Sequence, residues 1–230
     1  VDNSATYVDI PVHSTSSNGG GHSGGSSGGN AADTQPPADN TTGSAVQTGS
    51  FSDVNTGNWY YSAVEYVASK GIMTGISASS FGPNLDTTRG MIVTILYRLE
   101  NQPTGTEAAA FSDVRAGQYY ADAIAWANAN GIVTGYGNGL FGPNDAITRE
   151  QMAAILYRYA QYKEYDVSAS AELTAFSDAA NVSRYAVDAM KWANAAGLIN
   201  GVTSSKLAPG NSAARAQVAS ILMRFCENIK

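Results

Sequence analysis

Residues 111–114 read Phe-Ser-Asp-Val; the same tetrapeptide stands at residues 51–54 and returns as Phe-Ser-Asp-Ala at residues 176–179. Each is followed by an aromatic-rich stretch, a glycine, a glycine-containing loop and a second apolar stretch that begins with an arginine. These features recur at spacings of 60 and then 65 to 66 residues. Self-similarity at a fixed spacing is typical of repeat architectures. We therefore predict three tandem copies, over residues 51–110, 111–175 and 176–230.

Each copy carries two stretches with the spacing of an amphipathic helix. In the first copy, apolar residues fall at i, i+3, i+4 and i+7 from Tyr60, and again from Ile92. This spacing places them on one face of an α-helix, and the other copies repeat it. A single helix pair cannot cover such faces, so the copies must pack on one another. The sequence predicts an all-α fold of three helix pairs, whose second helices (residues 89–99, 149–159 and 215–225) form a common core.

The first 50 residues have a different composition. They contain no Lys or Arg, and 13 of the 16 residues from Ser14 to Gly29 are Gly or Ser. Such a segment buries too little apolar surface to offset its ordering entropy. We expect residues 1–50 to be a flexible linker together with the end of an upstream region, and residues 14–48 to contact the folded part only sparsely.

Composition also excludes several classes of function. A net charge of −6 argues against non-specific nucleic-acid binding. No run approaches the roughly 18 apolar residues of a membrane helix, so we expect no membrane insertion. Both histidines, His13 and His22, precede the repeats, and Cys226 is the only cysteine. The repeats therefore offer no Ser-His or Cys-His pair and no histidine-based metal site. We expect no catalytic residue, metal or cofactor in this chain.

An arginine opens the second helix of every copy, at Arg89, Arg149 and Arg215. A cation in the first helical turn opposes the helix dipole at a cost of a few tenths of a kcal/mol. An arginine beside free helix-start N–H groups can receive a carboxylate or phosphate. The recurrence of this arrangement favours an anion site. The alternative is that these arginines are solvated or pair with an acid such as Glu150.

Glycines and aromatic residues recur near these arginines. The loop that precedes each arginine begins with a glycine: Gly75, Gly135 and Gly201. Tyr66, Trp126 and Trp192 occupy matching places in the first helices. An aromatic face beside a polar pocket suits sugar stacking, but core packing explains these rings equally well. The aspartates of the opening tetrapeptides are interpreted as cap or turn formers.

Together these motifs resemble three S-layer homology (SLH) motifs over about four-fifths of the chain. The features that carry the resemblance are the openings already quoted, Trp-Ala at 126–127 and 192–193, Gly-Ile-Val-Thr-Gly at 131–135, Phe-Gly-Pro-Asn at 81–84 and 141–144, and Ile-Thr-Arg-Glu-Gln at 147–151. The resemblance implies a non-catalytic, extracellular anchor of the bacterial cell wall or S-layer. It implies a pseudo-threefold arrangement with a central three-helix bundle, and a pyruvylated secondary cell-wall polysaccharide bound in grooves between motifs at Arg89, Arg149 and Arg215.

The third copy departs from the pattern, with Ala-Ala at 213–214 and Leu-Ala-Pro at 207–209. We therefore expect binding to depend on Arg89 and Arg149 more than on Arg215. The alternative function is a structural self-assembly module of a surface layer. In that case the repeats self-associate and the arginines form salt bridges with neighbouring subunits.

Overall fold

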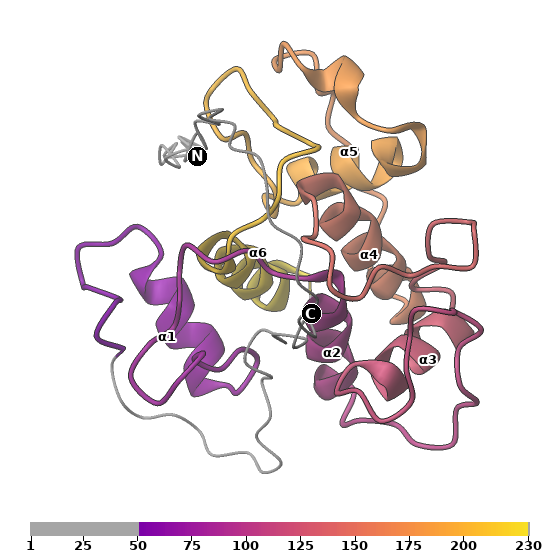
Figure 1. The fold of residues 1–230 in the computed structure, drawn as a ribbon. Helices are drawn as coiled ribbons and strands as arrows, with labels where there is room; N and C mark the ends of the chain where they lie inside the picture. Colours follow the sequence, from indigo (N-terminus) through magenta and orange to yellow (C-terminus); the bar gives the residue numbers. More distant parts are fainter. Residues whose placement is uncertain (1–50, 230) are drawn as a thin grey trace, which may run out of the picture.

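The computed structural model describes residues 51–229, so the predicted linker over residues 1–50 lies outside the described residues. Within this range the predicted all-α class is confirmed, and β-type pairing is limited to isolated bridges. The elements, shown in Figure 1, are α1 (Tyr61–Ser69), α2 (Arg89–Leu99), α3 (Ala121–Ala129), α4 (Arg149–Tyr162), the short 3₁₀ helices η1 (Ala179–Asn181) and η2 (Arg184–Ala186), α5 (Val187–Ala195) and α6 (Arg215–Asn228).

Local sequence signals set the helix ends. The Thr88 hydroxyl accepts from the N–H of Met91, and Thr148 forms a complete capping box with Gln151. Ala214, in the third copy, supplies no side-chain cap. The glycines that close the first helices, Gly71, Gly131 and Gly197, all adopt left-handed φ angles of 65° to 70°. This conformation suits glycine because it has no Cβ to clash.

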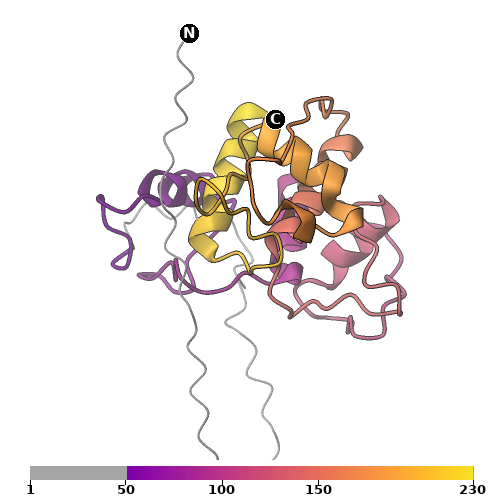
Figure 2. The same ribbon diagram turned by 90° about the horizontal axis from the view of Figure 1, so that it is seen from above.

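The closest helix pairs join different copies. The second helix of each copy packs against the first helix of the next, so that α2 packs on α3 and α4 on α5, while α6 returns to α1. Figure 1 shows α1, α3 and α5 toward the outside of the molecule and α2, α4 and α6 nearer the middle, and in Figure 2 α1 and α6 lie side by side. The first and last α-helices of the described range thus lie together, which closes the three copies into a ring.

The second helices α2, α4 and α6 contribute their apolar faces to the hydrophobic core, as the sequence predicts. Ile95, Ile155 and Ile221 are all buried and belong to one continuous hydrophobic core. The Tyr159 ring of α4 lies 5.8 Å from the Phe225 ring of α6, so these two helices meet through long side chains. The Tyr159 hydroxyl donates to Glu100 just after α2, at 2.6 Å. The arrangement of the helices about a threefold axis stays a prediction.

Three backbone hydrogen bonds connect the loops before α2, α4 and α6 in a closed triangle. The N–H of Thr87 donates to Ala213, that of Ala213 donates to Ile147, and that of Ile147 donates to Thr87, over 2.8 to 3.1 Å. Because each bond joins a different pair of copies, the three loops are held relative to one another independently of side chains.

Candidate functional site

Each helix-opening arginine binds the loop of the following copy rather than its own. Arg89 Nε donates to the Phe141 carbonyl at 2.9 Å, Arg149 Nε to the Leu207 carbonyl at 3.0 Å, and Arg215 Nε to the Phe81 carbonyl at 2.8 Å. A second donor, Nη2, reaches Asn200 from Arg149 and Thr74 from Arg215. The arginines therefore clamp neighbouring copies together in cyclic order.

The expectation of free helix-start N–H groups beside these arginines is wrong. The N–H groups of Arg89 and Gly90 donate to carbonyls of the second copy's loop, at Asp145 and Pro143, over 3.0 and 2.9 Å. The starts of α4 and α6 make the same pair of bonds to the loops of the third and first copies. Backbone carbonyls of a neighbouring copy thus occupy the donors that an anion would need.

Burial changes the electrostatics of the arginines. Arg149 is only 2% exposed, and burial lowers its pKa to about 10, so it stays protonated at neutral pH. Burial also lowers the pKa of Arg89, against the opposing influence of Tyr136 and Asp145. The alternative of solvated surface arginines is excluded by this burial. Glu150 instead accepts from the N–H and hydroxyl of Ser183, at 2.9 and 2.7 Å.

The opening aspartates hold the same loops from the other side. Asp53 accepts from the N–H groups of Phe81 and Gly82, at 2.8 Å each, and Asp113 and Asp178 do the same in their copies. The peptide groups of residue 81 are therefore held at the N–H by Asp53 and at the carbonyl by Arg215. These aspartates are loop clamps and not helix caps.

The three loop glycines are required by close packing. A Cβ on Gly75, Gly135 or Gly201 would lie 2.6 Å from the ring of the opening phenylalanine of its own copy. Any side chain there would displace the ring or the loop. Of the three, Gly75 also lines the cavity described below.

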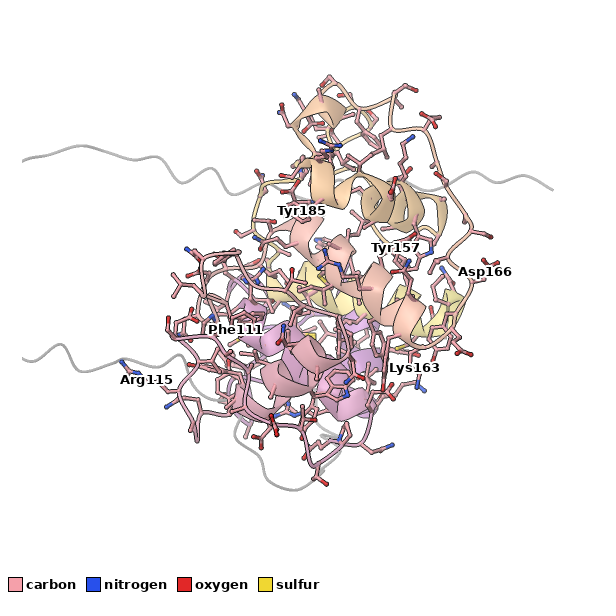
Figure 3. The ribbon with its side chains drawn as sticks, turned by 90° about the vertical axis from the view of Figure 1, so that its right-hand side faces the viewer. Phe111, Arg115, Tyr157, Lys163, Asp166 and Tyr185 are labelled. Atoms are coloured by element: carbon pink, nitrogen blue, oxygen red, sulfur yellow. The ribbon has the colours of Figure 1, made fainter. Side chains whose placement is uncertain are left out.

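The tryptophans proposed as sugar platforms lie inside the helix pairs. Trp126 and Trp192 are 2% and 1% exposed, and their rings lie 5.7 and 5.4 Å from those of Tyr97 and Tyr157 across the α2–α3 and α4–α5 interfaces. Figure 3 labels Tyr157 on α4. Tyr66, in the matching place on α1, is half-buried, with the Lys70 ammonium 4.9 Å from its ring. Packing accounts for both tryptophans.

A cavity of about 200 Å³ opens where all three copies meet, and we call it the first groove. The loop and second helix of the first copy supply most of its wall, Tyr119 comes from the second copy and Arg215 from the third. Its apolar side chains are Met73, Ile76, Leu85, Met91 and Ile95, and its polar ones are Asp86, Thr87, Thr94, Tyr119 and Arg215.

Two polar groups in the first groove distinguish it from ordinary packing. The Thr87 hydroxyl oxygen is buried and has no hydrogen-bond partner among residues 51–229. The Asp86 carboxylate accepts the Ser212 hydroxyl at 2.9 Å through one oxygen, Oδ1. Buried polar groups are usually satisfied, so an orphaned hydroxyl in a cavity wall points to a ligand or bound water. Sequence reasoning missed Asp86, Thr87 and Tyr119. Asp86 and Thr87 do not recur in the second copy, where Ala146 and Ile147 take their places, so the repeat gives no signal for them. Tyr119 does lie at a recurring aromatic position, and that signal could have found it.

Because the copies are joined in cyclic order, each arginine binds the loop of the following copy and not the loop that precedes it in the sequence. The irregular loop of the third copy, Leu207-Ala208-Pro209, is clamped by Arg149, whereas Arg215 clamps the regular loop Phe81-Gly82-Pro83. The expectation that the Arg215 groove is the weakest assumed that arginine and loop belong to one copy, and that assumption is wrong.

The place that corresponds to the first groove one copy later is formed by Arg89, Tyr136, Asp145 and Tyr185, and we call it the second groove by analogy. The Arg89 guanidinium lies 4.6 Å from the centres of both the Tyr136 and the Phe141 rings. Tyr136 and Tyr185 are 44% and 53% exposed, and the Tyr185 hydroxyl donates to Glu150 at 3.1 Å. Figure 3 labels Tyr185 ahead of α5.

Over the described range, no group of three His, Cys, Asp or Glu side chains is arranged to hold a metal ion. The helices within residues 51–229 are also too short or too polar to cross a bilayer.

Comparison with known proteins places these features in a family. The S-layer homology domain family matches residues 50–90, 110–153 and 175–219, one stretch in each copy. The chain is 36% identical to an amylopullulanase of Thermoanaerobacterium thermosulfurigenes over 77% of its length, which is 9% of that relative. It is 29% identical to the surface-layer 125 kDa protein of Lysinibacillus sphaericus over 81% of its length, which is 15% of that relative.

A third relative is the S-layer protein sap of Bacillus anthracis, at 34% identity over 46% of the chain and 13% of the relative. The chain thus spans less than a fifth of the length of these relatives. The three family matches cover more than half of the chain and coincide with its three copies. The chain therefore belongs to the S-layer homology domain family and is an anchoring module of the cell surface and cell wall.

Proposed function

We propose that this chain anchors its protein by binding a pyruvylated wall polysaccharide in the first groove, with a ketal-bearing sugar at the end of the glycan entering the cavity. The unpartnered, buried hydroxyl of Thr87 in the wall of this cavity is the observation that carries the proposal. The groove combines a mainly apolar wall with a few polar groups, which is the usual composition of a small-ligand site.

The charges in the groove suit an acidic sugar. Arg215 brings a positive charge into the cavity wall, and the Phe81 and Thr74 carbonyls orient its guanidinium. A guanidinium attracts a carboxylate more strongly where water is scarce, so the ketal carboxylate is expected to lie on this side. The Asp86 carboxylate accepts hydrogen bonds, which suits the hydroxyl groups of the same sugar.

The apolar wall adds a second element of recognition. Ile76, Met91 and Ile95 line the cavity and provide contact for the methyl group of a ketal or for the apolar face of a sugar ring. Burial of one methyl-sized group contributes about 0.8 kcal/mol. A pyruvate ketal carries both a methyl and a carboxylate on one carbon, so it matches a wall that is apolar on one side and cationic on the other.

The proposal is tested with Thr87→Val in the full 230-residue chain. Valine keeps the shape of threonine and removes only the hydroxyl, which makes no hydrogen bond within residues 51–229. Loss of one sugar hydrogen bond is expected to weaken binding of a pyruvylated wall-glycan fragment about threefold to tenfold, measured by titration calorimetry. Mild acid treatment that removes the ketal should weaken wild-type binding further.

Thr74→Val is the matched control. The Thr74 hydroxyl is also buried without a partner among the described residues, but Thr74 does not line the cavity. Binding by this variant should equal that of the wild type, because the substitution removes only the Thr74 hydroxyl and leaves in place the backbone carbonyl that accepts from Arg215. If Thr87→Val and Thr74→Val bind equally well, or if removal of the ketal changes nothing, the proposed site is wrong.

A further inference from the structure

The first and second grooves differ at two corresponding positions. In the first groove these positions hold Ile76 and Leu85, and in the second they hold Tyr136 and Asp145, 60 residues later. Ile76 and Leu85 both line the open cavity. Tyr136 and Asp145 instead bind each other, with the Tyr136 hydroxyl donating to Asp145 Oδ2 at 2.8 Å.

Tyr136 is packed down onto the loop and onto the arginine of its groove. Its Cε2 would lie 2.5 Å from a Cβ added at Gly142, so the ring rests on the glycine backbone. Its ring centre lies 4.6 Å from the guanidinium carbon of Arg89, and the centre of the Phe141 ring lies at the same distance. Arg89 thus has two aromatic rings within cation–π distance, a stable arrangement for a cation.

The charge of Arg89 is also matched within the protein. Asp145 and Asp113 both interact electrostatically with Arg89. The residue at the place of Asp145 in the first groove is Leu85, which is uncharged. The first groove does contain the carboxylate of Asp86, but Oδ1 of that group accepts the Ser212 hydroxyl. A ligand carboxylate that approached Arg89 would therefore meet the carboxylate of Asp145. At the same place in the first groove it would meet the apolar side chain of Leu85.

We infer that Tyr136 and Asp145 close the second groove to the acidic sugar that enters the first groove, so that these two sites of the chain are not equivalent. This inference rests on the proposed function of the first groove. The Tyr136 ring, packed against Arg89, blocks the approach of a sugar to the guanidinium, and the Asp145 carboxylate repels a ligand of the same charge. The exposed edge of Tyr136 is thus a cover and not a stacking platform.

The test is calorimetric stoichiometry with a short wall-glycan fragment that carries a single terminal pyruvate ketal, using the full chain. The double variant Tyr136→Ile/Asp145→Leu recreates the pair found in the first groove. The double variant should bind one more fragment per chain than the wild type. Tyr136→Phe keeps the covering ring and should bind the same number of fragments as the wild type, which separates loss of the ring from loss of its hydrogen bond.

A conservative variant provides an independent measurement if the double variant does not fold. Tyr136→Ile alone uncovers Arg89 with a single substitution and should also bind more of the fragment than the wild type, whereas Thr87→Val alters only the first groove and should weaken only the binding there. A folded double variant that binds no more fragments than the wild type would overturn the inference while leaving the first groove intact. No binding by the wild type at all would instead refute the proposed function.

Discussion

The guanidinium Nε of Arg215 lies 2.8 Å from the carbonyl oxygen of Phe81, which is 134 positions earlier in the chain. This contact joins the last copy to the first, and Arg89 and Arg149 make the corresponding bonds to Phe141 and Leu207. The three copies therefore form a closed ring in which each binds both of the others. The same contact places Arg215 in the wall of the first groove, so one residue serves both the fold and the candidate site.

Replacement of a clamping arginine by lysine should lower stability. An ammonium cannot reproduce the planar fork with which Arg149 reaches the Leu207 and Asn200 carbonyls. At this buried position, loss of one charged hydrogen bond should lower the free energy of unfolding by about 1–3 kcal/mol. Urea denaturation of Arg149→Lys measures this, with Arg115→Lys as the control, since Arg115 is exposed, as Figure 3 shows. Equal midpoints for the two variants would contradict the clamp.

The aspartate clamps make stability depend on acid pH. Burial acts to raise the pKa of Asp53 and Asp178, but their hydrogen bonds outweigh it, and both pKa values lie below the ordinary 3.8. A lowered pKa in the folded state contributes stability above the unfolded pKa, and this is lost as the pH falls through 3.8 toward the folded value. Unfolding free energies of the wild type and Asp53→Asn/Asp178→Asn, measured from about pH 6 to pH 2, should therefore converge at the acid end. If the difference in unfolding free energy between wild type and variant stayed constant across this pH range, the ionised carboxylates of Asp53 and Asp178 would not be the source of the stability.

Substitution of a loop glycine should be far more costly than substitution of an open one. A Cβ at Gly201 would lie 2.6 Å from Cε1 of Phe176, whereas one at Gly57 would meet no atom within 4 Å. Gly201→Ala is expected to lower the free energy of unfolding by about 1–3 kcal/mol through overpacking. Gly57→Ala should stay within about 0.5 kcal/mol of the wild type. Thermal unfolding of both variants measures this difference. Equal stability of Gly201→Ala and Gly57→Ala would mean that the loop rearranges at little cost to make room for the methyl group.

Removal of the third copy should loosen the first. Truncation after residue 175 deletes α6, which packs on α1, and also deletes the Arg215 clamp on the Phe81 loop. Val64 and Val67, now buried in α1, would lose that cover. Hydrogen exchange should become faster over residues 61–69 of the truncated chain than over the same residues of the full chain. Unchanged protection there would show that the first copy is stable without ring closure.

Local sequence was sufficient to predict the elements. The 60-residue repeat and the i, i+3, i+4, i+7 spacing from Ile92 predicted helix pairs and a buried face, and both predictions are confirmed. These features depend on neighbours within about two helical turns, so a short stretch of chain contains the whole signal. The family resemblance likewise needed only short motifs, and the family match confirms it.

The pairing of copies was decided by tertiary structure alone. Nothing in the spacing around Arg149 indicates that its carbonyl partners are Leu207 and Asn200 in the next copy, because hydrogen bonds between distant segments leave no periodic trace in sequence. The first groove is assembled in the same way, from Thr87, Tyr119 and Arg215 of three different copies. The repeated sequence determines which donors, acceptors and apolar side chains each copy presents. Which copy they contact depends on how the three copies pack into a closed ring, because only there do residues far apart in the chain become adjacent.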